Sequence, residues 1–375
     1  MFGRGITLFR LFGFEVRLDW SWLIIAVLVT WSLARGVFPN YYVGLSRHTY
    51  WAMGAAGMVG LFLSIVLHEF GHSYVARRQG IPMHGITLFI FGGVAEMGED
   101  SKSPKAEFQV AIAGPIVTAI IAAVCFGLAH LSHAASWSVA VRGVLSYLAW
   151  VNVVLLAFNL VPAFPLDGGR VLRSILWALK KNVRWATRVA ARIGTIFAFL
   201  LMAWGIFCFI FDNFILGVWY FLIGIFIRNA SQVSYQQVLM RSALAGEPVR
   251  RFMTAQPVTV PSSATLRDVV EDYLYKYPYK LYPVVQEGHL LGCLGIDQIK
   301  LVPKEHWTST TAGTVAVPCS SENMIDPEAD ATKALSAMSR TRSSRLMVVD
   351  HGHLLGIIAF KDLALFLSRR MELQQ

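Results

Sequence analysis

Hydrophobic residues gather before residue 230 in long runs, and charged residues stand mainly between those runs. A helix that crosses a bilayer needs about 20 mostly apolar residues. The runs therefore predict six membrane-spanning helices with soft ends, at 20–34, 51–76, 108–131, 141–163, 194–211 and 213–228. After residue 230 the pattern changes to short strands flanked by Pro and Gly and to amphipathic helices, which is typical of a soluble α/β domain.

Composition supports a membrane protein with a soluble part. The chain has 375 residues, of which 55% are hydrophobic and only 15% are charged, whereas soluble domains carry about 25% charged residues. This excludes a disordered chain and argues against a purely soluble enzyme. The cysteines form no CxxC pair, which argues against both a disulfide framework and a thiolate zinc site; they are Cys125, Cys208, Cys293 and Cys319.

The position of the positive charge predicts the orientation. A net charge of +10 could indicate a nucleic-acid partner, but in membrane proteins basic residues mark cytoplasmic loops. Here they concentrate before the first span and after the second, fourth and sixth, while the other loops hold few. We therefore expect a multi-pass protein of the cell membrane with both termini and the soluble tail in the cytoplasm, and no nucleic-acid partner.

The second predicted span contains the pattern H-E-x-x-H, formed by His68, Glu69 and His72. Residues four apart on a helix lie on one face, so the two imidazoles can share a metal ion. Glu69 lies beside them and can take a proton from a metal-bound water. Zinc suits neutral imidazole and keeps an open position for hydrolysis. Ionisable residues inside a membrane span are costly, which favours a functional interpretation.

A third ligand is expected at the end of the fourth span. There Asp167 follows a Pro-rich stretch and precedes Gly168 and Gly169. The carboxylate can turn back into the bundle and complete a catalytic zinc set of two His and one Asp. The alternative is that Asp167 only caps the helix that starts at the two glycines. Spans two and four both run inward, so both halves of the predicted site meet at the cytoplasmic side.

Between the second and third spans, residues 85–97 alternate in polarity and break at Gly92-Gly93. This predicts a short β-hairpin that is too short to span the membrane. An edge strand formed by Gly92, Gly93 and Val94 could pair with an unwound substrate through its main chain. The alternative is a membrane-surface loop without substrate contact.

The two motifs together resemble the site-2 protease family of intramembrane zinc metalloproteases, over about residues 1–230. His68, Glu69 and His72 match its first motif, and the stretch from Asn159 to Gly168 matches its N-x-x-P-x-x-P-L-D-G motif. The resemblance implies one zinc ion per chain, held by His68, His72 and Asp167, with Glu69 activating water. It also implies that Asn159 helps to hold the substrate backbone or the developing oxyanion.

The tail contains an internal repeat. Val284–Gly292 recurs 64 residues later as Val348–Gly356, with seven of nine positions identical. Each copy indicates a strand, a tight turn and a second strand, preceded by an amphipathic helix at 265–275 or 330–339. The repeat predicts a two-lobed α/β module.

This module resembles a tandem pair of CBS domains, at 249–302 and 320–370. Such pairs commonly bind ATP or another adenine nucleotide between the copies, and they can form homodimers. The family's Gly–Ser/Thr–Asp ligand pattern is reduced here, and Asp362 alone remains as a ribose-binding candidate. A packing or dimerisation module without ligand is the alternative. With a CBS pair attached, the branch of the protease family that the chain resembles is the stage IV sporulation protein FB group.

The sequence thus predicts a polytopic α-helical membrane protein of about six spans with a small membrane-associated β-hairpin, plus a soluble α/β tandem CBS module. The expected division is a protease domain at 1–230, a helical linker at 231–248 and the two CBS domains. The expected activity is hydrolysis of a peptide bond in a transmembrane segment of a membrane-anchored protein, near the cytoplasmic face. The rival hypotheses are a CBS-regulated transporter and a catalytically inactive scaffold.

Overall fold

The computed structural model describes residues 6–11, 14–81, 83–89, 92–97, 101, 103–211, 213–320, 322–341 and 343–372. The chain divides into two compact units, Met1–Val238 and Leu239–Gln375. We refer to them as the membrane unit and the tail.

In the described part of the membrane unit, six helical segments are long and apolar enough to cross a bilayer, which confirms the predicted number of spans. The first segment is composite, with α1 (Trp20–Ser32), a π-helical turn (Leu33–Val37) and α2 (Phe38–Tyr41). The other five are α3 (Arg47–Arg78), α4 (Pro104–Ala134), α5 (Val139–Asn159), α7 (Val183–Phe211) and α8 (Phe214–Leu244).

Large apolar side chains on the outside of these helices agree with a lipid environment. Val27, Leu200 and Ile210 are each more than 60% exposed, and soluble monomers rarely carry large continuous patches of this kind. A further helix, α6 (Asp167–Lys180), follows α5 and is strongly amphipathic. The sequence analysis considered a helix here only as the alternative that starts at the two glycines, because a short amphipathic helix carries no membrane-span signal.

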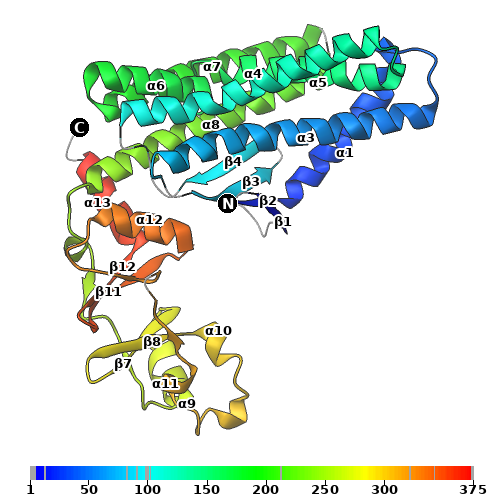
Figure 1. Ribbon diagram of the computed structural model, residues 1–375. Coiled ribbons are helices and arrows are strands. Elements are labelled where there is room, and N and C mark those ends of the chain that lie inside the picture. The colour runs from blue at the N-terminus through cyan, green and yellow to red at the C-terminus, as the bar shows by residue number, and fades with distance from the viewer. Residues whose placement is uncertain are drawn as a thin grey trace. The chain divides into compact units, whose positions relative to one another are not determined.

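A four-stranded sheet belongs to the membrane unit, with strand order β1-β2-β3-β4 (Figure 1). The antiparallel pair β3 (Met83–Phe89) and β4 (Gly92–Met97) is the predicted hairpin. The strands β1 (Ile6–Leu11) and β2 (Phe14–Leu18) were not predicted, and β2 joins β3 in parallel. The signal was the alternation that buries Phe14, Val16 and Leu18.

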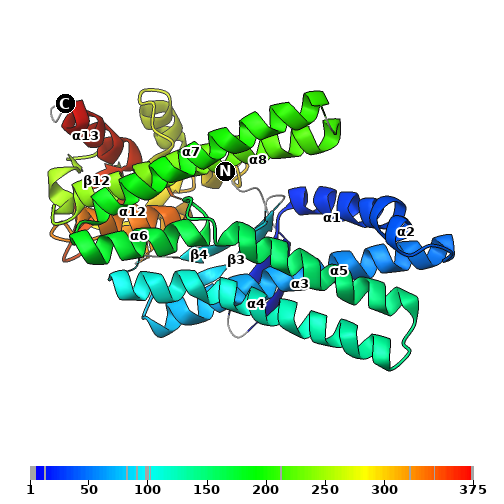
Figure 2. The same cartoon turned by 90° about the horizontal axis from the view of Figure 1, so that it is seen from above.

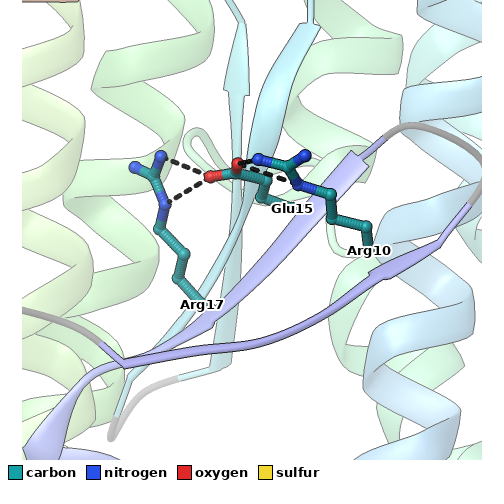
Figure 3. Close-up of polar contacts among 3 residues, drawn as sticks. All are labelled: Arg10, Glu15 and Arg17. Atoms are coloured by element: carbon teal, nitrogen blue, oxygen red, sulfur yellow. Dashed lines mark hydrogen bonds and ion pairs between the residues drawn. The ribbon is translucent and has the colours of Figure 1, made fainter.

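The other face of this N-terminal hairpin carries charge (Figure 3). Glu15 on β2 lies between Arg10 and Arg17, with N–O distances of 2.6 and 2.7 Å. The hydrogen bonds from Arg17 and then Arg10 lower the pKa of the Glu15 carboxyl. The hairpin therefore has an apolar face toward the unit and a charged face away from its core.

The tail contains an eight-stranded sheet whose main path runs β10-β11-β12-β8-β7-β6. Its two central hairpins are β7 (Leu281–Gln286) with β8 (His289–Gly295), and β11 (Arg345–Asp350) with β12 (His353–Ala359). Both turns have two central residues with positive φ, Glu287-Gly288 and His351-Gly352, as type I′ turns require. The sequence repeat is therefore a structural repeat.

Each lobe of the tail has its own apolar core. One lobe packs around Leu346 and Ile358, and the other around Tyr282 and Leu294. The remaining tail elements are short, apart from α12 and α13: η2 (Val249–Arg251), β5 (Thr254–Ala255), β6 (Val260–Pro261), α9 (Leu266–Asp268), η3 (Val269–Leu274), α10 (Ile296–Ile299), η4 (Lys304–His306), α11 (Ala312–Val315), β9 (Val317–Pro318), β10 (Met324–Ile325), α12 (Ala331–Thr341) and α13 (Phe360–Glu372).

Candidate metal centre

The two motif histidines lie on one face of α3 and are buried. His68 and His72 are 7% and 3% exposed, and their Nε2 atoms are 3.1 Å apart. The helical spacing of four residues produces this approach.

The Asp167 side chain from α6 meets both imidazoles. Its Oδ2 lies 3.1 Å from His68 Nε2 and 3.2 Å from His72 Nε2. The N-cap position of α6 is Leu166, and Asp167 is the first helical residue. Asp167 is therefore not the N-cap residue of α6, which was the alternative interpretation of this carboxylate.

The outer nitrogens of the imidazoles have fixed partners. His72 Nδ1 lies 2.7 Å from the carbonyl oxygen of Val110, and His68 Nδ1 lies 2.8 Å from Thr118 Oγ1, both on α4. A carbonyl can only accept, so His72 carries its proton on Nδ1 and leaves a lone pair on Nε2. A hydrogen bond from His68 Nδ1 to Thr118 gives the same tautomer. Ligating histidines are commonly held in this way.

The donor set fits a divalent metal ion. Asp167 Oδ2 is buried and has no hydrogen-bond partner among the residues that the structure describes, although two imidazole nitrogens face it. Lone pairs this close repel one another unless a cation lies between them. Tetrahedral ligands about 2.0–2.2 Å from zinc are spaced roughly 3.4 Å apart, close to the observed 3.1–3.2 Å.

Gly114 on α4 makes room for the imidazoles. A Cβ atom at this position would overlap His72 Nε2 and lie 2.7 Å from His68 Nε2. Gly71 on α3 lets α4 approach closely, because a Cβ atom at this position would lie 3.1 Å from the Ala113 carbonyl oxygen.

Glu69 faces strand β4. A Cβ atom at Gly93 would lie 2.6 Å from Glu69 Cγ and 3.1 Å from its Oε1. The hairpin that the sequence placed between spans two and three therefore lies against the glutamate of the motif. Among the described residues, the Glu69 carboxylate has no hydrogen-bond or ion-pair partner, so it is available to take up a proton.

The loop before Asp167 is held by three helices, which sequence reasoning missed. Ser231 Oγ on α8 donates to the Phe164 carbonyl oxygen, and the Phe164 N–H donates to Ala190 of α7 at 3.4 Å. A Cβ atom at Gly194 would overlap that same carbonyl oxygen. The Arg173 guanidinium of α6 lies 5.0 Å from the centre of the Phe164 ring.

A buried ion pair fixes α6 against α4. Arg173 Nε donates to Glu107 Oε1 at 2.6 Å, and the two residues are 7% and 1% exposed. Glu107 lies one turn before Val110, whose carbonyl orients His72. The sequence interpretation counted Arg173 only as a cytoplasmic loop charge.

The structure does not join Asn159 to this cluster. Asn159 is the last residue of α5 and has no side-chain hydrogen bond among the described residues. A different asparagine is buried close by: Asn152 donates to Ser64 Oγ at 3.0 Å, and Ser64 lies one turn before His68. The predicted role of Asn159 stays a prediction.

In the tail, the Asp362 carboxylate is used locally. Its Oδ2 accepts from the Ala359 N–H at 3.1 Å at the start of α13. Gln298 makes the matching bond to Gly295 in the first copy, at 3.0 Å. The two repeats therefore share the same capping hydrogen bond at the start of a helix. Nucleotide binding at Asp362 stays a prediction.

Comparisons with known proteins agree with this geometry. The family model of Peptidase family M50 matches residues 56–134 and 126–202, and the CBS domain model matches 249–302 and 317–369. The chain is 35% identical to Rip3 of Mycobacterium tuberculosis over 96% of this chain and 92% of that protein. It is 32% identical to "Zinc metalloprotease MJ0392" of Methanocaldococcus jannaschii, over 96% and 95%.

A solved structure titled "Site-2 Protease from Methanocaldococcus jannaschii" is 31% identical and covers 61% of this chain and 94% of its own, with a TM-score of 0.44. The matches to Rip3 and MJ0392 extend over nearly the whole chain, so they include the CBS pair as well as the membrane unit. Family membership implies zinc, and the His68–His72–Asp167 cluster fits it. The chain belongs to Peptidase family M50, as a multi-pass membrane zinc metalloprotease of the site-2 protease type that carries a tandem CBS pair.

Proposed function

We propose that the protein hydrolyses a peptide bond within a transmembrane segment of a membrane-anchored protein, near the cytoplasmic face of the membrane. The observation that carries this proposal is the convergence of His68, His72 and Asp167 inside a bundle of long apolar helices, with Glu69 beside them. Family membership argues against a transporter, and the intact donor set argues against an inactive scaffold.

His68, His72 and Asp167 would hold the zinc ion, which when bound supplies Lewis-acid polarisation to the scissile carbonyl and to water. Val110 and Thr118 keep both imidazoles in the ligating tautomer. Glu69 accepts the proton of the attacking water on its carboxylate and returns it to the leaving nitrogen. Burial of the cluster limits access of bulk water to the site.

Strand β4 is the part of the membrane unit best placed to hold substrate. It lies at an edge of the sheet, and Gly93 contacts Glu69. A substrate segment that unwinds could add to this edge through main-chain hydrogen bonds, with Gly92, Gly93 and Val94 opposite it. Such pairing would place an extended peptide bond beside the metal ligands. We propose that Asn159 contacts the substrate backbone or the oxyanion.

The proposed orientation rests on Arg77 and Arg78 at the end of α3 and on the basic residues of α6. A cytoplasmic location of the tail is tested by fusing a reporter that is active only in the cytoplasm to the C-terminus. An inactive reporter in a fully expressed fusion would reverse the orientation and move the cleavage position to the opposite face.

The activity is tested by co-expression with candidate membrane-anchored substrates, comparing wild type with Glu69→Gln. The variant should keep its zinc and lose cleavage at least about a hundredfold, since general acid–base catalysis contributes this much or more. Glu305→Gln is the matched control, because it makes the same chemical change at an exposed residue of the tail. Retained cleavage in Glu69→Gln would remove this glutamate from its role.

For the tail, we propose that an adenine nucleotide binds between the two repeats. The copies meet at their hairpin turns, where Leu290 N–H donates to the Gly352 carbonyl oxygen at 3.0 Å and the His289 and His353 rings are 3.9 Å apart. These contacts between the two turns support a nucleotide site that is formed by both copies.

The nucleotide proposal is tested by calorimetric titration of the full-length protein with ATP, ADP and AMP, with Asp362→Ala as the variant. No heat with any nucleotide would favour the homodimer alternative, which light scattering measures directly.

A further inference from the structure

A cleft between α7 and α8 lies outside the metal centre. It has a volume of about 180 Å³ and is lined by polar and basic side chains together with Ala191: Arg188, Arg192, Thr195, Ser231, Gln232 and Tyr235. Figures 1 and 2 both show the two helices running side by side. At about 30 Å³ per water molecule, the volume holds roughly six waters or a group of similar size.

The charge of this cleft is not balanced by acids. Neither 183–211 nor 214–244 contains an Asp or a Glu. Arg188 lines the cleft and its Nε donates to Tyr235 Oη at 2.9 Å, so this contact occupies only one of the guanidinium nitrogens. Within the described part of the chain, no carboxylate pairs with Arg188 or Arg192. Two arginine side chains that line one cleft, without a carboxylate partner among the described residues, favour an anion there.

A third arginine lies on the same side of the helix pair. Arg228 of α8 is one turn before Ser231 and Gln232, and its guanidinium carbon is 5.6 Å from the centre of the Phe199 ring. Its Nε is buried and has no hydrogen-bond partner within the described part of the chain. Arg228 thus adds a third positive charge on the face of α8 that carries Ser231 and Gln232.

The cleft lies at the depth where the apolar part of α7 begins. Thr195 lines it, and Ile196, Phe199 and Leu200, which follow directly, are 53–65% exposed. Toward the start of α7, Arg184 and Arg188 are exposed together with Trp185. Basic pockets between helices at this boundary can reach lipid headgroups, and their positive charge favours anionic ones.

The cleft is also joined to the loop that carries the third metal ligand. Ser231 lines it and donates to the Phe164 carbonyl oxygen, three residues before Asp167. Gly194 lets α7 approach the same oxygen. An anion held by Arg188 and Arg192 of α7 and by Gln232 and Tyr235 of α8 would therefore bridge the two helices that hold this loop.

We propose that the α7–α8 cleft binds a phosphate-bearing anion, namely the headgroup phosphate of an anionic lipid or free inorganic phosphate. Arg188 and Arg192 supply the charge, and Tyr235, Gln232 and Thr195 supply hydrogen bonds. Binding of the anion in the cleft stabilises the loop that carries Asp167. The proposal concerns binding, so it stands apart from the substrate and the membrane orientation of the protease.

The full-length protein, purified in a neutral detergent and stripped of lipid, is titrated by calorimetry with three probes. They are short-chain phosphatidylglycerol, short-chain phosphatidylcholine and inorganic phosphate. Phosphatidylglycerol should bind at least tenfold more tightly than phosphatidylcholine. Tight binding of inorganic phosphate would identify the free ion as the source, and its failure to bind would identify the lipid.

The variant R188Q/R192Q should weaken binding of the anionic probe about thirtyfold, at about 1 kcal/mol for each basic residue. The control K180Q/R184Q removes the same charge from neighbouring residues outside the cleft and should change binding less than threefold. R188K/R192K keeps the charge and should recover part of the affinity. Zinc content and the thermal midpoint show that each variant is folded.

Two results would overturn the proposal. One is equal affinity for both lipids with no binding of inorganic phosphate. The other is the same loss of binding in K180Q/R184Q as in R188Q/R192Q, which would reduce the cleft to one part of a general basic surface.

Discussion

The membrane unit and the tail bury opposite kinds of residue. Within the described residues, every buried polar or charged side chain belongs to the membrane unit, including His68, His72, Asn152, Glu107 and Arg173. Alanine is the most frequent residue among its buried apolar positions, at 13 of 28 described positions. The tail instead buries large aliphatic side chains such as Leu346, Ile358 and Leu294 in its two cores.

The difference reflects the solvent around each unit. Lipid is as apolar as leucine, so burying leucine between membrane helices gains little, and close packing of small residues with polar contacts holds the bundle instead. The tail is surrounded by water, where each buried aliphatic side chain contributes about 1.5–3 kcal/mol. The protease therefore keeps its chemistry in the unit where polar contacts also specify the fold.

The largest expected effect comes from breaking the buried ion pair of the membrane unit. Glu107→Gln leaves Arg173 charged and buried without a counter-charge, which costs about 3–5 kcal/mol. We expect loss of the α6 position, of bound zinc and of cleavage. Zinc analysis and thermal unfolding in detergent measure this.

The matched control is Glu328→Gln, in the exposed pair of the tail with Arg250. Exposed pairs contribute about 0–1 kcal/mol. If both variants lost equally little thermal stability and zinc, the ion pair of the membrane unit would contribute no more than an exposed ion pair does.

The next effect tests the core of the tail. Leu346 is fully buried, so Leu346→Ala should destabilise the tail by about 2–5 kcal/mol. Zinc content should not change, because the metal centre lies in the other unit. Leu355→Ala, at a 39% exposed position of the same hairpin, is the control. Loss of zinc in Leu346→Ala would show that the two units do not fold separately.

A smaller effect is expected when the space for the imidazoles is filled. Gly114→Ala should lower zinc affinity about tenfold or more, the scale seen when groups around metal ligands are disturbed. Gly127→Ala lies in the same helix and has nothing within 4 Å of the added Cβ. Competition with a zinc chelator compares the two, and equal affinities would mean that α4 moves to accommodate the methyl group.

Asp330 makes the stability of the tail depend on pH. Burial opposes its ionisation, but hydrogen bonds from the Thr332 side chain and from the N–H groups of Gly246 and Thr332 outweigh this and lower the pKa of its carboxyl. A lowered pKa stabilises the fold above the usual value near 4, and this stabilisation is lost as the pH falls through the lowered pKa. Thermal midpoints from pH 7 to pH 3 should fall less in Asp330→Asn than in wild type.

The smallest effect is expected on the lipid-facing surface. Leu200 is 65% exposed, so Leu200→Ala should change stability by less than about 0.5 kcal/mol. A loss close to that of Leu346→Ala would contradict the proposed difference between the units and would indicate a protein contact at this face.

The sequence by itself determined the features that depend on local period. Six apolar runs, the four-residue spacing of His68 and His72, and the repeated hairpin of the tail follow from residues within one element. Helix and strand geometry converts such spacing into a shared face without any knowledge of distant residues. Asp167 was also found from sequence, because its Pro and Gly neighbours mark a break at the end of a span.

Only the tertiary structure decided which distant groups complete the site. The partners of the imidazoles lie 38 and 50 residues away, and Arg173 lies 66 residues from Glu107. The parallel pairing of β2 with β3, the contact between Gly93 and Glu69, and the α7–α8 cleft likewise arise from elements brought together by packing. No periodicity within one element encodes these choices, because they depend on which helix faces meet and on how closely glycines allow them to approach.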